Sequence, residues 1–259
     1  MLLSLTAFVL ANTPPPPPPL RWSQLSVTHN KKPLLTDSAV DAHRGRLMGV
    51  LGPSGAGKTT LLLALSGMTP YHGRKKLTGV CEQGILDPAH VAMLSQTESF
   101  FGMLTVRETL ALAAALQPGG DVSAGSSGTD ERVDALLQTL GLADVASTRV
   151  GDATHRGISG GEKRRLAVGC ELLGDPALLV TDEPTTGLDA YQAERVVRLV
   201  QRTAVTLDIP AIATLHQPRS SIWSSLDDVL VLAPGGRVGG CYAQHEAPFP
   251  QRSTRGSLP

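Results

Sequence analysis

The chain has 259 residues, with 23 basic and 23 acidic side chains and a formal net charge of zero, so no basic excess argues for a nucleic-acid partner. This length can bury the core of one large domain, or of a domain with a subdomain. The three cysteines, Cys81, Cys170 and Cys241, match no disulfide or zinc spacing, which suits a reducing compartment.

The first 19 residues are expected to lie outside the folded domain. Residues 1–11 are apolar but too short to span a membrane, and they lack the basic start of a signal peptide. We interpret them as a disordered or mispredicted leader, with a targeting segment as the alternative. The prolines at 14–19 are typical of a stiff spacer, with a proline-motif ligand as the alternative.

Two extended segments are expected: residues 21–29, where apolar and polar side chains alternate, and residues 34–40, which carry Leu34, Leu35, Ala39 and Val40. The Asn-Lys-Lys-Pro sequence at 30–33 is typical of a turn. We therefore expect a small antiparallel sheet that leads into a short buried strand at 47–51. Trp22 is interpreted as a packing residue of this sheet.

A phosphate-loop pattern, G-x-x-x-x-G-K-S/T, follows that strand at residues 52–59 and leads into an apolar helix at 60–65. Glycines let backbone N–H groups wrap an anion, and the helix N-terminus adds partial positive charge. Lys58 can reach the β- and γ-phosphates of a nucleotide, and the Thr59 hydroxyl can bind Mg²⁺. A glycine-rich turn without a ligand is the alternative, but the flanking strand and helix favour a nucleotide site. The expected phosphate-binding residues are Gly52, Pro53, Ser54, Gly55, Ala56, Gly57, Lys58, Thr59 and Thr60.

Short strands and turns are expected at residues 70–90, which contain several glycines and a proline. Another short apolar strand is predicted at 91–96, and it ends in the polar residue Gln96.

Residues 103–170 are expected to form a helical insertion between strands of the main sheet. Thr105 and Glu108 have the spacing of a capping box and predict a helix that continues to residue 117. The segment 118–130 is rich in Gly and Ser and is expected to be a loop, followed by a second helix at 131–140.

A second capping box, Ser159 with Glu162, predicts a helix start within residues 158–166. Gly160 and Gly161 lie beside this helix terminus, where exposed backbone N–H groups suit a phosphate. Taken alone, the pattern also fits an ordinary helix start.

A buried strand is predicted at 177–184, and it ends in two carboxylates, Asp182 and Glu183. A carboxylate beside a phosphate loop can hold Mg²⁺, and its neighbour can orient and deprotonate a water molecule. Two solvated carboxylates at a strand end would be the simpler interpretation of this segment in isolation.

The last third of the domain continues the alternation of helices and strands. After a turn at 185–189, a helix is expected at about 191–203, a strand at 209–215 with His216 at its end, and a hairpin at 229–238. A histidine at the carboxyl edge of an open α/β sheet lies where such sheets bind ligands.

Taken together, the motifs resemble the nucleotide-binding domain of an ABC transporter, over about residues 20–240. The resemblance rests on the phosphate loop, Gln96 as the Q-loop, 158–162 as the signature, 178–183 as Walker B, 187–189 as the D-loop and His216 as the switch histidine. The segments 156–164, 184–189, 215–219 and 221–223 resemble the G (white/brown) subfamily in particular.

The resemblance implies an α/β phosphate-loop NTPase core with a small antiparallel β subdomain and a helical insertion. It implies that this domain spans 20–242, ahead of an irregular tail at 243–259. It further implies that ATP and Mg²⁺ are the ligands, with Thr59, Gln96 and Asp182 around the metal. Glu183 would be the general base for water, and His216 would contact the γ-phosphate. The signature residues Ser159, Gly160, Gly161 and Glu162, with Asp189 of the D-loop, would complete the site of a second copy.

The partners implied are a second ATP-binding domain, identical or different, and a membrane domain on another chain or in a longer form of this protein. The expected location is the cytoplasmic face of a membrane, with no nucleic-acid partner. The chain stops where the subfamily would continue toward its first membrane helix, so we expect a split or truncated transporter. Two further departures are the lack of an aromatic residue near Thr28 or His29, where such domains often stack adenine, and Thr181 within the Walker B strand.

Three other functions are weighed against this one. A soluble ABC ATPase would usually carry two cassettes or a long coiled-coil insertion, and neither is present. A remnant that binds nucleotide without catalysis is disfavoured by the intact Lys58, Asp182, Glu183 and His216. A phosphate-loop kinase would have no use for the signature or the switch histidine.

Overall fold

The structure is a computed structural model, and it describes residues 20–68, 75–81, 88–96, 99–117, 127–152 and 154–243. The expected leader and proline segment, most of the loop at 118–130 and the tail beyond residue 243 lie outside these ranges. Within the described ranges, no helix is both long and apolar enough to cross a membrane.

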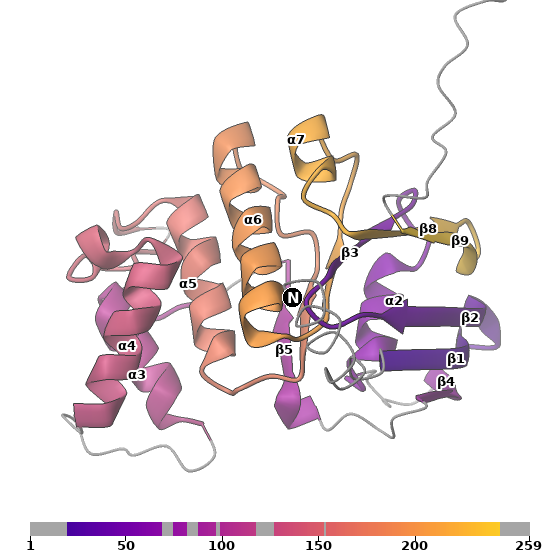
Figure 1. The fold of residues 1–259 in the computed structure, drawn as a ribbon, viewed down its shortest axis with the longest axis horizontal. Helices are drawn as coiled ribbons and strands as arrows, with labels where there is room; N and C mark the ends of the chain where they lie inside the picture. Colours follow the sequence, from indigo (N-terminus) through magenta and orange to yellow (C-terminus); the bar gives the residue numbers. More distant parts are fainter. Residues whose placement is uncertain are drawn as a thin grey trace, which may run out of the picture.

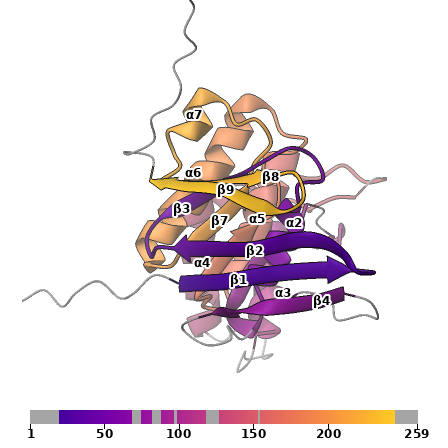
Figure 2. The same cartoon turned by 90° about the vertical axis from the view of Figure 1, so that its right-hand side faces the viewer.

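Two sheets form the framework of the domain (Figure 1). The larger has six strands in the order β5-β6-β7-β3-β8-β9, all parallel except for the last pair. Its strands are β3 (Leu47–Leu51), β5 (Val91–Leu94), β6 (Leu178–Thr181), β7 (Ala211–Thr214), β8 (Asp228–Ala233) and β9 (Arg237–Ala243). The smaller is antiparallel, and its strands lie side by side in the order β2-β1-β4 (Figure 2). They are β1 (Leu20–His29), β2 (Lys32–Ala42) and β4 (Lys75–Cys81).

Helices cover both faces of the larger sheet. One helix, α2 (Lys58–Leu65), packs between the two sheets, and α6 (Ala190–Leu207) covers the opposite face. The helices α3 (Val106–Ala115), α4 (Ser127–Leu140) and α5 (Gly160–Leu172) form a separate group beside α6, between β5 and β6 in sequence (Figure 1). Short elements complete the chain: the 3-10 turns Pro88–His90 and Ala143–Val145, and α7 (Ser220–Trp223). The predicted α/β fold with an antiparallel subdomain and a helical insertion is confirmed.

The strands of the larger sheet are apolar at nearly every position because both of their faces are buried. Leu178 and Val180 of β6 face the core that contains α2 and the smaller sheet, whereas Leu179 faces the core that contains α3, α5 and α6. Trp22 is buried in the first of these cores, as expected for a packing residue. Because β6, β7 and β3 pair in parallel, their carboxyl ends lie at one edge of the sheet, where the functional residues follow.

Several predicted boundaries were wrong by a few residues. The turn between β1 and β2 was predicted at residues 30–33 but contains only Asn30 and Lys31, because His29 already pairs with Lys32. Both turn residues have positive φ. The strand tolerates Pro33 because β2 is an edge strand, where a missing N–H costs no ladder bond.

Helices also start earlier than their sequence signals indicated. The helix α4 begins at Ser127, so residues 127–130 are not part of the predicted loop, and Asp130 and Asp134 form ion pairs with Arg107 of α3. The helix α2 begins at Lys58, two residues before the predicted start, and α6 continues four residues past its predicted end. The short helix α7 was not predicted.

Candidate functional site

The phosphate loop, residues 52–59, connects β3 to α2 and is held by close backbone approaches. A Cβ atom on Gly52 would lie 2.6 Å from the Leu232 carbonyl oxygen, and one on Gly57 would lie 2.9 Å from that of Leu34. Gly57 also has φ of 97°, a left-handed conformation that favours glycine. No side chain caps the N-terminus of α2, so its backbone N–H groups are available to an anion.

Lys58 lies inside this loop with only 6% of its surface exposed. Its Nζ donates hydrogen bonds to the carbonyl oxygens of Gly52 (3.0 Å) and Pro53 (3.2 Å). A buried ammonium group is costly without negative charge nearby, and phosphate oxygens would supply that charge. The loop therefore places its cation where an anion would enter.

The first carboxylate, Asp182, is brought against the phosphate loop by β6. The Thr59 hydroxyl donates to Asp182 Oδ2 at 2.8 Å, and the Thr214 hydroxyl donates to Oδ1 at 2.6 Å. Asp182 is 6% exposed, so these hydrogen bonds hold a nearly buried carboxylate in one orientation. Thr59 and Asp182 together present hard oxygen donors, the ligands that Mg²⁺ prefers.

The second carboxylate, Glu183, begins the turn after β6 in a left-handed conformation, with φ of 48°. Its backbone N–H donates to Thr214 Oγ1 at 2.8 Å, which fixes this uncommon conformation. Its Oε2 accepts hydrogen bonds from Thr186 Oγ1 at 3.0 Å and from Gln96 Nε2 at 3.3 Å. The predicted Q-loop glutamine and the predicted base are thus in contact.

A cavity of about 470 Å³ lies between the phosphate loop with Glu183, the start of β2, and the turn between β8 and β9. Its wall includes Ser54, Gly55, Gly57, Lys58, Thr59, Thr60 and Glu183, with Lys32, Pro33, Leu34 and Gly235 on the other side. The sequence interpretation considered the neighbourhood of Thr28 and His29 for the base-stacking position, whereas the residues beside the loop are Lys32, Pro33 and Leu34. Ala56 instead points into the core and is buried.

His216 follows β7, beside the start of the phosphate loop. It lines a separate hollow of about 280 Å³ together with Leu51, Gly52, Pro53 and Gln217. The predicted switch histidine and the loop are therefore neighbours at the same sheet edge.

The signature and the D-loop lie together, away from the cavity of their own phosphate loop. Ser159 caps α5, and Glu162 Oε2 accepts hydrogen bonds from the Ser159 N–H and hydroxyl, both at 2.7 Å. Gly160 packs beside Leu188, a Cβ on Gly161 would collide with Gln192, and Asp189 caps α6. None of these residues lines the 470 Å³ cavity, and α5 and α2 are well separated in Figure 1.

Three residues of the site were missed by sequence reasoning. Thr214 and Thr186 hold the two carboxylates, and Arg164 of α5 donates to the carbonyl oxygens of Ser95 (2.7 Å) and Gln96 (3.1 Å). Position at a strand end was a signal for Thr214, since His216 two residues later was selected on that ground. Nothing in the sequence indicated the partners of Arg164.

Comparisons with known proteins agree on one family. The sequence profile of the family described as "ABC transporter" matches residues 35–186. The chain is 42% identical over 229 residues to ABC transporter G family member 7 of Arabidopsis thaliana, covering 85% of this chain and 31% of that protein. It is 38% identical over 231 residues to ABC transporter G family member 1 of the same plant, covering 88% and 30%.

A solved structure supports the fold independently. The ADP conformation of an ATP-binding cassette of an ABC transporter superposes with a TM-score of 0.69 at 19% identity, covering 89% of this chain and 93% of the other. The chain spans less than a third of the length of the curated relatives it matches.

Proposed function

Because this chain belongs to the ABC transporter family and is an ATP-binding domain similar to its G family members, we propose that its ATP hydrolysis powers transport through a membrane domain. The membrane domain would lie on a partner chain or in a longer form of this protein. The observation that carries the proposal is the convergence of Lys58, Thr59, Asp182 and Glu183 at one sheet edge.

The phosphate loop would hold the triphosphate through its backbone N–H groups and Lys58. Thr59 and Asp182, with the side chain of Gln96, would hold Mg²⁺, which neutralises phosphate charge when it is bound. The donor set fits this ion, because all three side chains offer oxygen atoms. The nucleotide base would meet the apolar surfaces of Pro33 and Leu34 rather than an aromatic ring.

Glu183 would accept a proton from the attacking water as general base. Two hydrogen bonds to Oε2, from Gln96 and Thr186, orient its carboxylate, and Thr214 fixes its backbone. Such positioning is required for proton transfer, since the base must lie within hydrogen-bond reach of the water. His216 would contact the γ-phosphate from its place beside Gly52.

A complete site would require two ATP-binding domains. Within this chain the signature lies apart from the phosphate-loop cavity, which supports a role for its glycine-rich terminus in the site of a second domain. We propose a head-to-tail dimer, identical or mixed, in which Ser159, Gly160, Gly161 and Glu162 of one domain face the nucleotide of the other, with Asp189 beside them. ATP would then add contacts across the interface, and hydrolysis would remove them.

The membrane domain would dock on an apolar groove beside the Q-loop, here called the docking groove. This cavity of about 300 Å³ is lined by Met93, Leu94, Ser95, Ser99, Phe100, Phe101, Thr109, Leu112, Ala113, Leu116, Ala167, Cys170 and Glu171. Phe101 is 72% exposed and Leu116 is 75% exposed, which is typical of a surface that a partner covers. This docking would hold the domain at the cytoplasmic face of a membrane.

The experiment that tests the proposal measures ATP turnover and nucleotide binding separately. We expect Glu183→Gln to retain ATP binding and to lose turnover by about a hundredfold or more, because a general base is removed. Lys58→Ala should instead weaken nucleotide binding itself. Glu131→Gln, an exposed change on α4, is the matched control and should leave both properties unchanged. Turnover unaffected by Glu183→Gln would exclude this residue as the base.

A further inference from the structure

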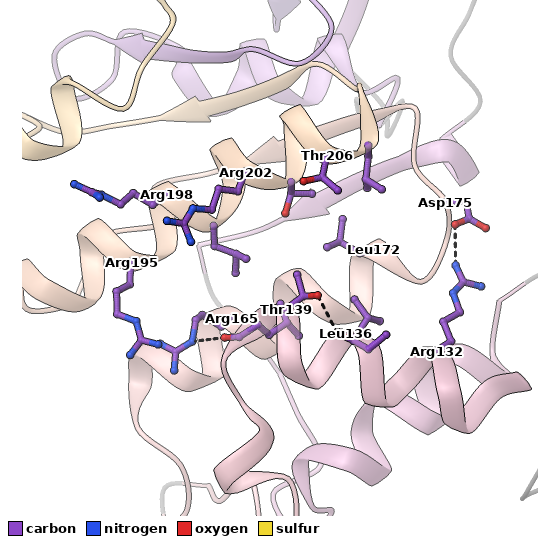
Figure 3. Close-up of a pocket in the computed structure, with 15 residues that line it drawn as sticks. Arg132, Leu136, Thr139, Arg165, Leu172, Asp175, Arg195, Arg198, Arg202 and Thr206 are labelled. Atoms are coloured by element: carbon purple, nitrogen blue, oxygen red, sulfur yellow. Dashed lines mark hydrogen bonds and ion pairs between the residues drawn. The ribbon is translucent and has the colours of Figure 1, made fainter. Parts of the chain in front are cut away.

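A second large cavity lies between α4, α5 and α6, and no part of the phosphate loop lines it. Its volume is about 590 Å³, within the range of about 300–1,000 Å³ that small-molecule sites occupy. Figure 3 shows side chains from the three helices pointing toward a common space. We call it the arginine cavity, after the five arginines in its wall: Arg132, Arg165, Arg195, Arg198 and Arg202.

The positive charge of this wall is only partly compensated. Asp175 is the one carboxylate among the lining residues, and it pairs with Arg132 at 2.8 Å. Arg198 pairs with Glu194, its neighbour on α6, at 2.7 Å. The remaining three arginines have no carboxylate partner within hydrogen-bonding distance among the residues that the structure describes.

These three cations differ in what surrounds them. Arg165 is nearly buried and donates to the carbonyl oxygens of Leu140 and Gly161 and to Gln192 Oε1. Arg195 lies over the ring of Tyr191, 5.7 Å from its centroid. Burial, followed by the neighbouring charge of Arg195, lowers the pKa of Arg165, although the nearby Glu162 carboxylate acts in the opposite direction.

The charges are concentrated at one end of the cavity. Figure 3 places Arg165, Arg195, Arg198 and Arg202 toward that end, whereas the Arg132–Asp175 pair closes the opposite end. Between the two ends Figure 3 shows aliphatic side chains, among them Leu136 and Leu172, and Leu140 and Leu199 also line the cavity. The cavity is therefore polarised, with a cationic end and an apolar floor.

We propose that the arginine cavity binds a small amphipathic anion. The anionic head lies among Arg165, Arg195 and Arg202, and an aliphatic body covers the leucines of the floor. Each part of this ligand complements one feature of the wall. The anionic head forms charge-assisted hydrogen bonds with the guanidinium groups, and the aliphatic body displaces water from the leucines. An inorganic anion would leave the floor hydrated, and a neutral amphiphile would leave the arginines without a counter-charge.

Dodecyl phosphate, kept below its micelle-forming concentration, is a suitable probe for calorimetric titration of the full 259-residue chain. We expect saturable binding of one molecule per chain. Inorganic phosphate carries the head alone and dodecyl maltoside carries a neutral head, so both should bind at least about tenfold more weakly. Equal affinity for either of these compounds would overturn the proposal.

Two variants locate the site. Arg195→Ala and Arg202→Ala should each weaken dodecyl phosphate binding by about tenfold, the effect of losing one charge-assisted hydrogen bond. Both side chains are at least partly exposed, so the fold should tolerate these changes. Arg21→Ala, which removes an exposed paired arginine from β1, is the matched control. Unchanged binding in both variants, or loss of binding in Lys58→Ala, would place the probe elsewhere and contradict the proposal.

Two further readouts separate this site from alternatives. Dodecyl phosphate should raise the thermal unfolding midpoint of the wild-type chain, because a ligand that binds the native state stabilises it. A lower midpoint would indicate denaturation by the amphiphile and would overturn the proposal. A glutamate-rich peptide that binds more tightly than dodecyl phosphate would assign the surface to a protein partner instead. Vesicles of phosphatidylcholine with and without phosphatidic acid identify the source: Arg202-dependent sedimentation indicates a bilayer lipid, and its absence indicates a soluble amphiphile.

Discussion

Two buried threonines on adjacent strands have opposite hydrogen-bonding situations. Thr214, at the end of β7, donates to Asp182 at 2.6 Å and accepts from the Glu183 N–H at 2.8 Å. Thr181, at the end of β6, is also fully buried, but its hydroxyl has no hydrogen-bond partner within the described part of the chain. A valine at either position would keep the shape and remove the hydroxyl.

The two substitutions should therefore change stability in opposite directions. We expect Thr214→Val to lower the free energy of unfolding by about 2 kcal/mol, because a buried carboxylate loses a donor. Thr181→Val should raise it by about 1 kcal/mol, because an unsatisfied polar group leaves the core. Urea denaturation of both variants measures the difference, and destabilisation by Thr181→Val would show that its hydroxyl is satisfied.

Glu171 makes the stability of the folded domain depend on pH. Burial in the docking groove raises the pKa of this carboxyl, although the Met93 N–H donates to it at 2.9 Å. A raised pKa means that the folded state favours the protonated form of Glu171. The protonated carboxyl stabilises the fold relative to the ionised one, and this stabilisation is lost as pH rises through the raised pKa. We expect the wild type to lose stability relative to Glu171→Gln as pH rises above about 4.5. Denaturation of both proteins at several pH values tests this, and a constant difference would contradict it.

Fixed spacing made some site residues predictable from sequence and left others out of reach. Lys58, Thr59, Asp182 and Glu183 belong to motifs in which each residue type serves a phosphate, a metal or a water. The position of Thr214 at a strand end was a signal, but its hydrogen-bond partners lie 32 and 31 positions away in the chain. Only the pairing of β6 with β7 brings them together, and a single sequence does not state that pairing.

At the scale of elements, α5 packs closely against α4 and α3 at one of its glycines, Gly169. A Cβ on Gly169 would collide with the Leu140 side chain of α4 and would lie 3.1 Å from that of Leu110 of α3. Leu110 and Leu140 are themselves buried, although Leu140 also lines the arginine cavity.

Gly169→Ala sets helix propensity against packing. Alanine favours a helix interior by about 1 kcal/mol over glycine, but overpacking of a core costs about 1–3 kcal/mol. We expect a net loss of about 1 kcal/mol in the free energy of unfolding. Gly160→Ala is the comparison, since its Cβ would make an ordinary contact of 3.7 Å with Leu188, and it should leave stability unchanged. A more stable Gly169→Ala protein would show that the helices can separate at little cost.

Capping signals predicted element starts better than composition did. The Thr105–Glu108 and Ser159–Glu162 boxes both form, and each begins the helix that its spacing indicated. The start of α4 was missed because Ser127 and Gly128 look like loop residues by composition. Pairing of Asp130 and Asp134 with Arg107 is a tertiary contact that local propensity does not contain.

At the scale of the whole molecule, the separation of signature and phosphate loop has a measurable consequence. If two copies complete each other's sites, ATP should favour the dimer, and Glu183→Gln should prolong it by preventing hydrolysis. We expect sedimentation velocity of this variant to show a larger dimer fraction with ATP and Mg²⁺ than without. Adding Lys58→Ala to the same variant should abolish the response, and a chain that remains monomeric would require a different partner domain.

Helix α5 takes part in four sites at once. Its first turn carries the signature, Arg164 holds the Q-loop carbonyl groups, one side lines the docking groove and the other side lines the arginine cavity. Thermodynamic linkage between such sites is symmetrical. Suppose that a ligand in the arginine cavity raises the affinity of this domain for a membrane domain. The bound membrane domain must then raise the affinity for that ligand by the same factor.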